Sequence, residues 1–449
     1  MKDPIERLVG RLPRRYRSIV PLTGAVIVQL TIGSQYTYGN ILPYILSYQQ
    51  VLVDAGVTEA MMSWVFSLIG LPGSYLLGGW LQARFGIRIA SLMMSLLTWQ
   101  AQALFLSIIK NTQRFSVTVA LSYYTIQAPF GWFLFSYGIV YSVTSCALYN
   151  IAIVCAVQWL PHRAGLASGI VVGGYGLGAF VFSPIETAFV NPDNLSPDEH
   201  GIFHQSALLK RVPAMFLVIA ALFFIMQLIG ILLMIAPPDY EHEIERDALQ
   251  SAKHQSVHPK AAAKSATFWW IFFTLFFNTP VMAAVSTYYK SFGETFIRDD
   301  FFLTSVNSVA SICNALGRPF WGYIGDRWSY QLAMSLVTAL LAALLFALPS
   351  TTLTGGWALM VFICALYFCL SGTYALIPQV IEKAFGPAHF GLNYGWIYMA
   401  PSVASPGTSL VATFLLPTVG YTGVWFTSAA CVCVSFALTI TIQRTKYGA

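Results

Sequence analysis

The sequence predicts an all-α membrane protein with twelve transmembrane helices in two six-helix halves and both termini in the cytoplasm. The chain is 57% hydrophobic and 9% charged, its mean hydropathy is +0.65, and apolar runs of membrane-spanning length recur along it. A soluble surface needs about 25–35% charged residues, so most of this surface must face lipid. The net charge of +6 comes from scattered residues without a basic stripe, which excludes a nucleic-acid partner.

Twelve apolar runs are long enough to cross a lipid bilayer, which takes about 20 mostly apolar residues. Backbone polar groups cannot stay unpaired in lipid, so runs of this length predict helices rather than a barrel. The apolar stretch 115–129 is expected to extend the third or fourth helix. The runs cover residues 18–45, 61–81, 89–109, 130–159, 164–188, 213–236, 266–290, 301–323, 330–349, 356–380, 390–416 and 422–442.

Lys and Arg residues between the runs predict the orientation, because they gather on the cytoplasmic side. With the N-terminus inside, seventeen of them fall in inside segments and six in outside segments. We expect the plasma membrane, with an organelle membrane as the alternative. The predicted parts are a cytoplasmic segment at 1–17, a six-helix half at 18–236, a cytoplasmic linker at 237–265, a second half at 266–442 and a cytoplasmic tail at 443–449.

A short motif follows the second run and recurs after the eighth. The first copy holds Arg84 and Gly86, and the second holds Asp326 and Arg327. Glycine allows close helix contact, and these charges can pair with neighbouring helix ends. We therefore expect the four residues to take part in a conformational change.

This repeated loop, with six runs on each side of a central linker, resembles the signature of the major facilitator superfamily. The first copy has Ala83 in place of the usual acidic residue, and the second has Ser329 in place of a glycine. The resemblance implies the major facilitator fold and transport by alternating access. In the fifth run, Gly165 and Gly169 are expected to permit the close packing that lets the two halves rock.

No pattern in the chain predicts an enzyme. Intramembrane catalysis would need paired carboxylates, a His-Glu-x-x-His helix or a Ser/His arrangement. All seven histidines lie between the runs, and the carboxylates Glu59, Glu186 and Glu382 are at run ends. We expect neither catalysis nor a metal or cofactor.

One charged residue, Arg318, lies inside a run. An arginine near the bilayer centre costs about 2.5–3.5 kcal/mol on insertion scales. It could snorkel to the cytoplasmic face, but no acidic residue mid-run can pair with it, which favours a cavity where it meets an anionic substrate. A guanidinium matches a carboxylate with a bidentate fork, and Asn314, one turn earlier, can add an amide hydrogen bond.

The pair Arg318-Pro319, the Asn393-Tyr394-Gly395 sequence that opens the eleventh run, and the glycine-rich stretch 163–179 look like the oxalate/formate antiporter and monocarboxylate transporter families. In those families the arginine of helix eight binds the substrate carboxylate, a role that falls on Arg318. Oxalate transporters place a lysine where this chain has Pro401. The resemblance thus implies a monocarboxylate such as lactate, pyruvate or formate.

Several tyrosines are candidates for hydroxyl donors in a small cavity, although helix packing is the alternative for each. We expect the substrate to meet Tyr36, Tyr141, Tyr374 and Tyr398, together with Asn393 of the resembling motif.

Rival interpretations and the mode of coupling stay open. An oxalate-like dicarboxylate exchanger is one rival, a neutral-solute carrier with a structural Arg318 is another, and a receptor or scaffold without transport is a third. Protons or a counter-anion are the candidate coupling partners. Since Asn314 cannot titrate, a coupled proton is expected to use Glu294, Asp299 or Asp300.

Overall fold

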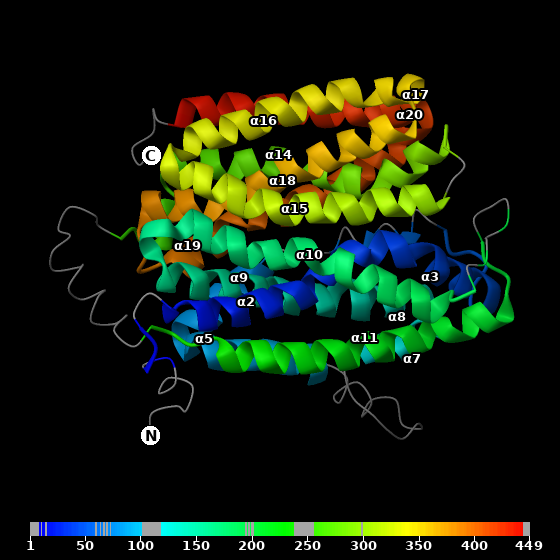
Figure 1. The fold of residues 1–449 in the computed structure, drawn as a ribbon, viewed down its shortest axis with the longest axis horizontal. Helices are drawn as coiled ribbons and strands as arrows, with labels where there is room; N and C mark the ends of the chain where they lie inside the picture. The colour runs from blue at the N-terminus through cyan, green and yellow to red at the C-terminus, as the bar shows by residue number, and fades with distance from the viewer. Residues whose placement is uncertain are drawn as a thin grey trace.

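Two sets of helices lie against each other along their length (Figure 1). In this computed structural model, α2 to α11 form the N-terminal set and α14 to α20 the C-terminal set. All regular structure in the described residues is helical. Those residues are 9, 11–13, 16–58, 61–62, 64–65, 68, 71, 73–100, 118–193, 195, 198, 202–237, 256–297 and 300–442.

The N-terminal set begins with a long helical element that changes type in its middle. An α-helical stretch passes through a 3-10 segment, η2, and becomes α-helical again, so three successive elements form one rod. A π-helical segment, η3, similarly lies within the rod formed by α8 and α9. The elements are α2 (Ile19–Ile32), η2 (Gly33–Thr37), α3 (Tyr38–Leu52), α5 (Ser74–Gln100), α7 (Thr118–Thr125), α8 (Phe130–Phe133), η3 (Leu134–Val140), α9 (Tyr141–Trp159), η4 (Pro161–Arg163), α10 (Ala164–Val190) and α11 (Ser206–Leu233).

The C-terminal set contains longer uninterrupted helices. Serine side chains accept backbone N–H bonds at the starts of α14 and α16, where Ser265 and Ser329 are the N-caps. Ser329, which stands where the resembling motif has a glycine, thus caps the start of α16 with its side chain. The elements are α13 (Pro259–Ala262), α14 (Ala266–Glu294), α15 (Asp300–Arg327), α16 (Tyr330–Ala347), η5 (Leu348–Ser350), α17 (Thr351–Thr354), α18 (Gly356–Phe385), α19 (Phe390–Ile397) and α20 (Met399–Thr441).

Eight helical elements among the described residues are long and apolar enough to cross a membrane. Two further breaks divide continuous helices: Gly86 in α5 and Gly420 in α20 have φ values of 77° and 66°. This left-handed region favours glycine, and the breaks lie where the sequence separates the second run from the third and the eleventh from the twelfth. The total of twelve spans and the orientation of the termini stay predictions.

The stretch 115–129 does not extend the helix of the fourth apolar run, residues 130–159. Of its described part, residues 118–125 form α7, and a turn then leads to Pro129, whose extended ψ of 142° precedes α8. Proline lacks a backbone N–H and begins the new helix.

The bundle has two distinguishable ends. The helices α2, α14 and α10 begin at one end, where α11, α15 and α20 finish (Figure 1). We call this the linker end, because α11 ends there and the described chain resumes there before α13. Of the polar residues discussed below, Asp326 lies at the linker end and Glu186 lies toward the opposite end.

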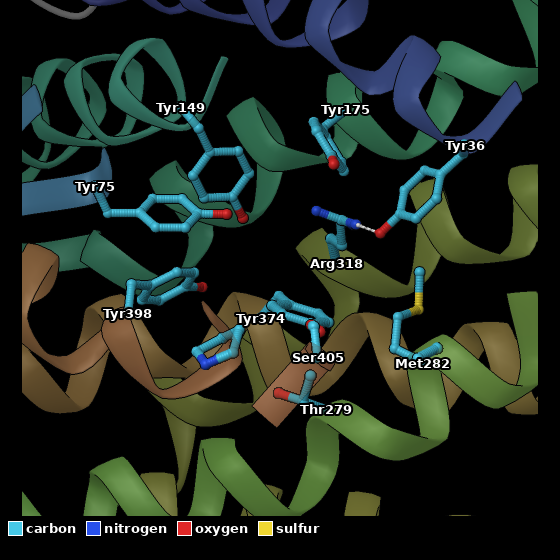
Figure 2. A pocket seen from close by; sticks show the side chains of 12 residues that line it. Tyr36, Tyr75, Tyr149, Tyr175, Thr279, Met282, Arg318, Tyr374, Tyr398 and Ser405 are labelled. Carbon is cyan, nitrogen blue, oxygen red and sulfur yellow. Dashed lines mark hydrogen bonds between the residues drawn. The ribbon is translucent and has the colours of Figure 1, made fainter. Parts of the chain in front are cut away.

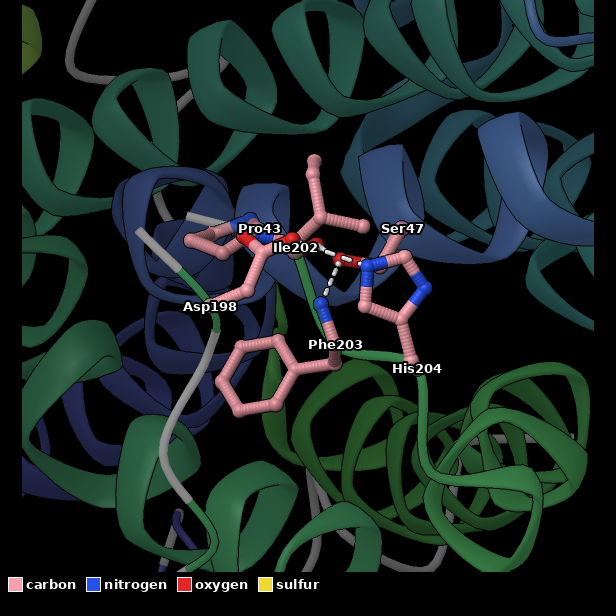
Figure 3. Close-up of polar contacts among 6 residues, drawn as sticks. All are labelled: Pro43, Ser47, Asp198, Ile202, Phe203 and His204. Carbon is pink, nitrogen blue, oxygen red and sulfur yellow. Dashed lines mark hydrogen bonds and ion pairs between the residues drawn. The ribbon is translucent and has the colours of Figure 1, made fainter. Parts of the chain in front are cut away.

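The loop between α10 and α11 is fastened to α3 at the opposite end (Figure 3). Asp198 accepts hydrogen bonds from the backbone N–H of Ile202 and from Nε2 of His204, both at 2.8 Å. The Phe203 N–H donates to Ser47 Oγ at 2.9 Å. These contacts fix the position at which α11 begins.

Within the N-terminal set, η2 packs directly on α10. A Cβ atom on Gly178 would overlap the backbone of Gly33, and one on Gly33 would overlap the backbone of Tyr175. Backbone atoms cannot rotate away as a side chain can, so only glycine fits at this crossing.

We expect Gly178→Ala to lower the free energy of unfolding by about 1–3 kcal/mol, because the added methyl group separates η2 from α10. Gly131→Ala is the matched control, since a Cβ at Gly131 meets no atom within 4 Å. Alanine has the higher helix propensity, so the control should be neutral or slightly stabilising. Thermal unfolding of purified protein in detergent measures both, and equal midpoints would contradict the close packing.

Candidate functional site

The guanidinium of Arg318 is buried between the two sets of helices. The residue is 1% exposed, although α15 continues for nine residues beyond it to Arg327. Its Nε donates to Asn314 Oδ1 at 2.8 Å, and its Nη2 donates to the Tyr36 hydroxyl at 3.4 Å (Figure 2). Nη1 has no hydrogen-bond partner among the described residues. Arg318 therefore does not snorkel, and it keeps donor capacity for a further group.

A cavity of about 90 Å³ lies beside Arg318. Helices of both sets line it, so a molecule bound there would touch both halves (Figure 2). Drug-sized ligands occupy pockets of about 300–1,000 Å³, and this cavity is far smaller. Its lining consists of Tyr36, Tyr75, Tyr149, Tyr175, Thr279, Met282, Ala283, Arg318, Tyr374, Tyr398, Pro401 and Ser405.

Aromatic rings surround the guanidinium. Its central carbon lies 5.4 Å from the centroid of the Tyr175 ring, and Tyr36 meets the same ring edge-on at 5.0 Å. Tyr175 is held in place because its hydroxyl donates to Gln35 Oε1 at 2.7 Å. The π-faces partly compensate the positive charge, and the hydroxyl groups give the cavity further donors.

No carboxylate lines the cavity, and no described Asp or Glu forms an ion pair with Arg318. A buried charge normally has a charged partner, because desolvation is costly. The cavity thus presents one cation with an unused N–H group to whatever enters it, an arrangement that complements a small anion.

Most of the predicted substrate residues meet at this cavity. Tyr36, Tyr374 and Tyr398 line it with Arg318, and Asn314 orients the guanidinium through its side-chain oxygen. Asn314 therefore positions the guanidinium and does not itself line the cavity.

Two predicted substrate residues lie elsewhere. The Tyr141 hydroxyl is 2.9 Å from Ser34 Oγ, and its ring stacks on Tyr137 at 5.3 Å, within the N-terminal set. Asn393 lies at the linker end, where its Nδ2 donates to the Val257 carbonyl at 3.0 Å. Both side chains are thus engaged in packing away from the cavity.

Five polar lining residues were not predicted from the sequence. Tyr175 carried a signal, because it interrupts the glycine-rich run of the fifth helix, and a large ring there needs open space. The other four resemble ordinary helix residues: Tyr75, Tyr149, Thr279 and Ser405. Pro401 was named for the lysine that it replaces, and it faces the cavity.

The second copy of the repeated motif joins the two sets at the linker end. Asp326, in the last turn of α15, accepts hydrogen bonds from the backbone N–H of Leu166 at 2.8 Å and of Gly165 at 3.2 Å. These are first-turn N–H groups of α10, so the carboxylate also meets the positive end of that helix. Glycines permit the approach, because a Cβ on Gly165 would overlap Gly322 and one on Gly169 would overlap the Arg318 carbonyl.

The first copy makes a different contact. Arg84 lies over the Trp80 ring at 5.7 Å, and Gly86 supplies the left-handed turn that ends one helix and begins the next. With Ala83 at the acidic position, this copy has no carboxylate to cap a helix. Arg327 ends α15 directly after Asp326.

Long apolar helices around a central cavity, with polar contacts between two halves, define a multi-pass membrane transporter. The Major Facilitator Superfamily profile matches residues 22–407, and the chain belongs to this family.

Two named transport proteins are similar to this chain in sequence. Apicoplast pyruvate carrier 1 of Toxoplasma gondii is 24% identical over 91% of this chain and 86% of its own length. The oxalate:formate antiporter of Oxalobacter formigenes is 26% identical over 66% of each chain.

Solved structures share the fold at low identity. The fucose:proton symporter FucP of E. coli superposes with a TM-score of 0.62 at 15% identity, covering 94% of this chain and 99% of FucP. The xylose transporter XylE of E. coli, partially occluded and inward open, gives a TM-score of 0.64 at 12% identity, covering 96% and 99%.

We expect Asp326→Asn to loosen the linker end, because hydrogen bonds to a charged group contribute about 1.5–3 kcal/mol. Spin labels at Phe85 and Leu332, exposed residues of the two halves, should move apart in pulsed electron paramagnetic resonance. Asp193→Asn, which removes the partner of Arg211 in the loop after α10, is the matched control. Identical distance distributions for all three proteins would contradict a role for Asp326 in closure.

Proposed function

We propose that this protein transports small monocarboxylate anions of the pyruvate, lactate and formate type by alternating access. The observation that carries the proposal is the buried Arg318 guanidinium, which faces a small cavity with an unused N–H group and no carboxylate partner. A substrate carboxylate supplies the missing counter-charge. Its departure leaves the cation with only neutral partners: the Asn314 amide oxygen, the Tyr36 hydroxyl and the Tyr175 ring.

The cavity supports one carboxylate rather than two. Arg318 is its single cation, and Pro401 stands where a lysine would be needed for a second anionic group. A dianion would bury one charge without a partner, which is costly. The name of the pyruvate-carrier relative agrees with a monoanion, whereas oxalate in the name of the antiporter makes a dicarboxylate the second candidate.

Neutral sugars are less compatible with the site, although the fucose and xylose carriers share the fold. Identities of 12–15% support only a common architecture. A sugar would leave the guanidinium uncompensated, and it needs more room than a three-carbon acid.

Alternating access requires contacts that form at one end and release at the other. We propose that Asp326, Gly165, Gly169 and Gly322 form the closed gate at the linker end. Their contacts combine close backbone approach with two hydrogen bonds, so they can separate as a unit. Arg327, which follows Asp326 at the end of α15, and Arg84 and Gly86 of the first motif copy belong to the same proposal.

Counterflow in proteoliposomes tests the proposed substrate class. Vesicles preloaded with pyruvate should take up labelled pyruvate. External lactate and formate should compete, oxalate should compete at least tenfold more weakly, and xylose should not compete. Arg318→Gln should abolish the exchange, because the anion loses its charge partner, and Arg318→Lys should retain little, because a point charge lacks the planar fork.

Folding must be separated from binding in that assay. Leu316→Met is a control for substitution in the same helix: it changes an apolar side chain two residues away that is 62% exposed. Both variants should insert and elute as folded protein, and the control should exchange pyruvate. Wild-type exchange by Arg318→Gln would refute the binding role, and equal competition by xylose would favour the neutral-solute carrier.

A further inference from the structure

A second charged residue is buried in the helical core, well away from Arg318. Glu186 lies in α10 and is 3% exposed. The sequence placed it at the end of an apolar run, but α10 continues to Val190 and packs its carboxyl group against η2. Glu186 is eleven residues from Tyr175 on the same helix, which is about 16 Å along the axis.

One oxygen of this carboxyl group, Oε1, can keep its hydrogen bond to Thr37 with or without a proton. Glu186 Oε1 accepts from the Thr37 hydroxyl at 2.8 Å, and the same hydroxyl lies 2.9 Å from the Ser34 carbonyl. When the carboxyl is ionised, Thr37 donates to it. When the carboxyl is protonated, it can donate to Thr37 Oγ1, and the threonine hydrogen turns to Ser34. One pair of groups therefore accommodates both protonation states.

No described cation neutralises Glu186. The titratable groups that face it are Tyr137 of η3 and Tyr141 of α9. Of the elements packed against α10, α2, η2, α3 and α9 carry no Lys, Arg, His, Asp or Glu. The charges of α15 and α18 are Arg318 at the cavity, Asp300 at the start of α15, and Asp326, Arg327, Glu382 and Lys383 at the linker end. The first turns of α11 carry Lys210 and Arg211, and η4, which precedes α10 at the linker end, carries His162 and Arg163.

The second oxygen of the carboxyl group, Oε2, has no hydrogen-bond partner of good geometry among the described residues. The neutral amide of Asn40 lies nearby, and its Nδ2 donates to Thr187 Oγ1 at 3.0 Å. An ionised carboxylate in such a place is costly, whereas a neutral carboxylic acid needs only the partners that are present. Glu186 is thus built to bind and release a proton as its surroundings change.

The segment η2 connects Glu186 to the anion site. Neighbouring residues of this single 3-10 turn contact the two sites: the Tyr36 hydroxyl accepts from Arg318, and the Thr37 hydroxyl donates to Glu186. Gln35 accepts from Tyr175, which covers the guanidinium. A shift of η2 on anion binding would therefore reach the carboxyl group directly.

We propose that Glu186 binds the proton that moves together with the anion held by Arg318. This inference rests on the proposed transport of monocarboxylates. The empty carrier, with ionised Glu186 and charged Arg318, has no net charge at the two sites. The fully loaded carrier, with a protonated Glu186 and an anion on Arg318, has none either. Loading one site alone leaves an uncompensated charge in the apolar core, so the two events are coupled.

The proposal changes the expected place of coupling. The sequence suggested Glu294, Asp299 and Asp300, which lie between the seventh and eighth apolar runs. Asp299 lies outside the described residues, and the side chains of Glu294 and Asp300 do as well. Glu186 instead belongs to the N-terminal set and is tied by hydrogen bonds to the turn that contacts Arg318.

The test uses the full chain in proteoliposomes with labelled pyruvate. An inward proton gradient of one pH unit should drive roughly tenfold accumulation in the wild type if one proton accompanies each anion. Glu186→Gln, which keeps the shape of the side chain, should lose this accumulation while pyruvate counterflow at equal pH persists. That counterflow should slow above neutral pH in the wild type and become independent of pH in the variant.

Two further variants exclude a merely structural effect. Glu186→Asp keeps a titratable group and should restore part of the gradient-driven accumulation. Asp193→Asn removes an exposed carboxylate from the loop after α10 and should behave as wild type. Accumulation by Glu186→Gln equal to that of the wild type would overturn the proposal, as would wild-type exchange that ignores the proton gradient. Absence of pyruvate exchange in the wild type would instead refute the proposed substrate.

Discussion

The cost of holding the Arg318 charge away from water governs the design of this protein. The guanidinium is 1% exposed and has no described carboxylate partner. Asn314, Tyr36 and Tyr175 reduce that cost through two hydrogen bonds and a π-face, but they leave Nη1 unbonded. In the proposed function, a bound anion completes the set, and its binding energy is then available for the rearrangement of the two halves.

The contact between α10 and α15 places the Arg318 charge at the interface of the two halves. Glycines bring α10 against α15 from Gly165 to Gly176, and Arg318 lies on the α15 side of this contact. The same helix pair carries the Asp326 contact at the linker end, so α10 and α15 connect the cavity to the proposed gate. The turn η2 adds a second connection, through Tyr36 and Thr37, to the buried Glu186.

Local sequence patterns predicted the helices and the position of Arg318, because both follow from the energetics of residues in lipid. Run length identifies a span, and a lone charge within a span requires a reason. The same local patterns could not decide which face of each helix meets the cavity. Tyr149 lines it whereas Tyr141, two turns earlier on the same helix, packs on Ser34. The resembling motif suggested that Asn393 meets the substrate, but its amide donates a hydrogen bond to the Val257 carbonyl at the linker end.

Burial was the property that sequence reasoning missed most clearly. Glu186 stands four residues before the end of α10, and by sequence alone it belongs to a polar helix end. The approach of η2, made possible by Gly33 and Gly178, covers it. Such coverage depends on contacts between segments about 150 residues apart, which no local pattern reports.

We propose that the buried Arg318 selects its ligand by negative charge rather than by shape. Pyruvate and its neutral amide, pyruvamide, have nearly the same shape and differ in charge. Thermal unfolding of the purified protein in detergent, with each compound over a range of concentrations, compares them directly. The account predicts that pyruvate raises the unfolding temperature in a saturable manner, since a ligand that binds the folded state stabilises it, and that pyruvamide does not. Equal stabilisation by the two compounds would contradict the account.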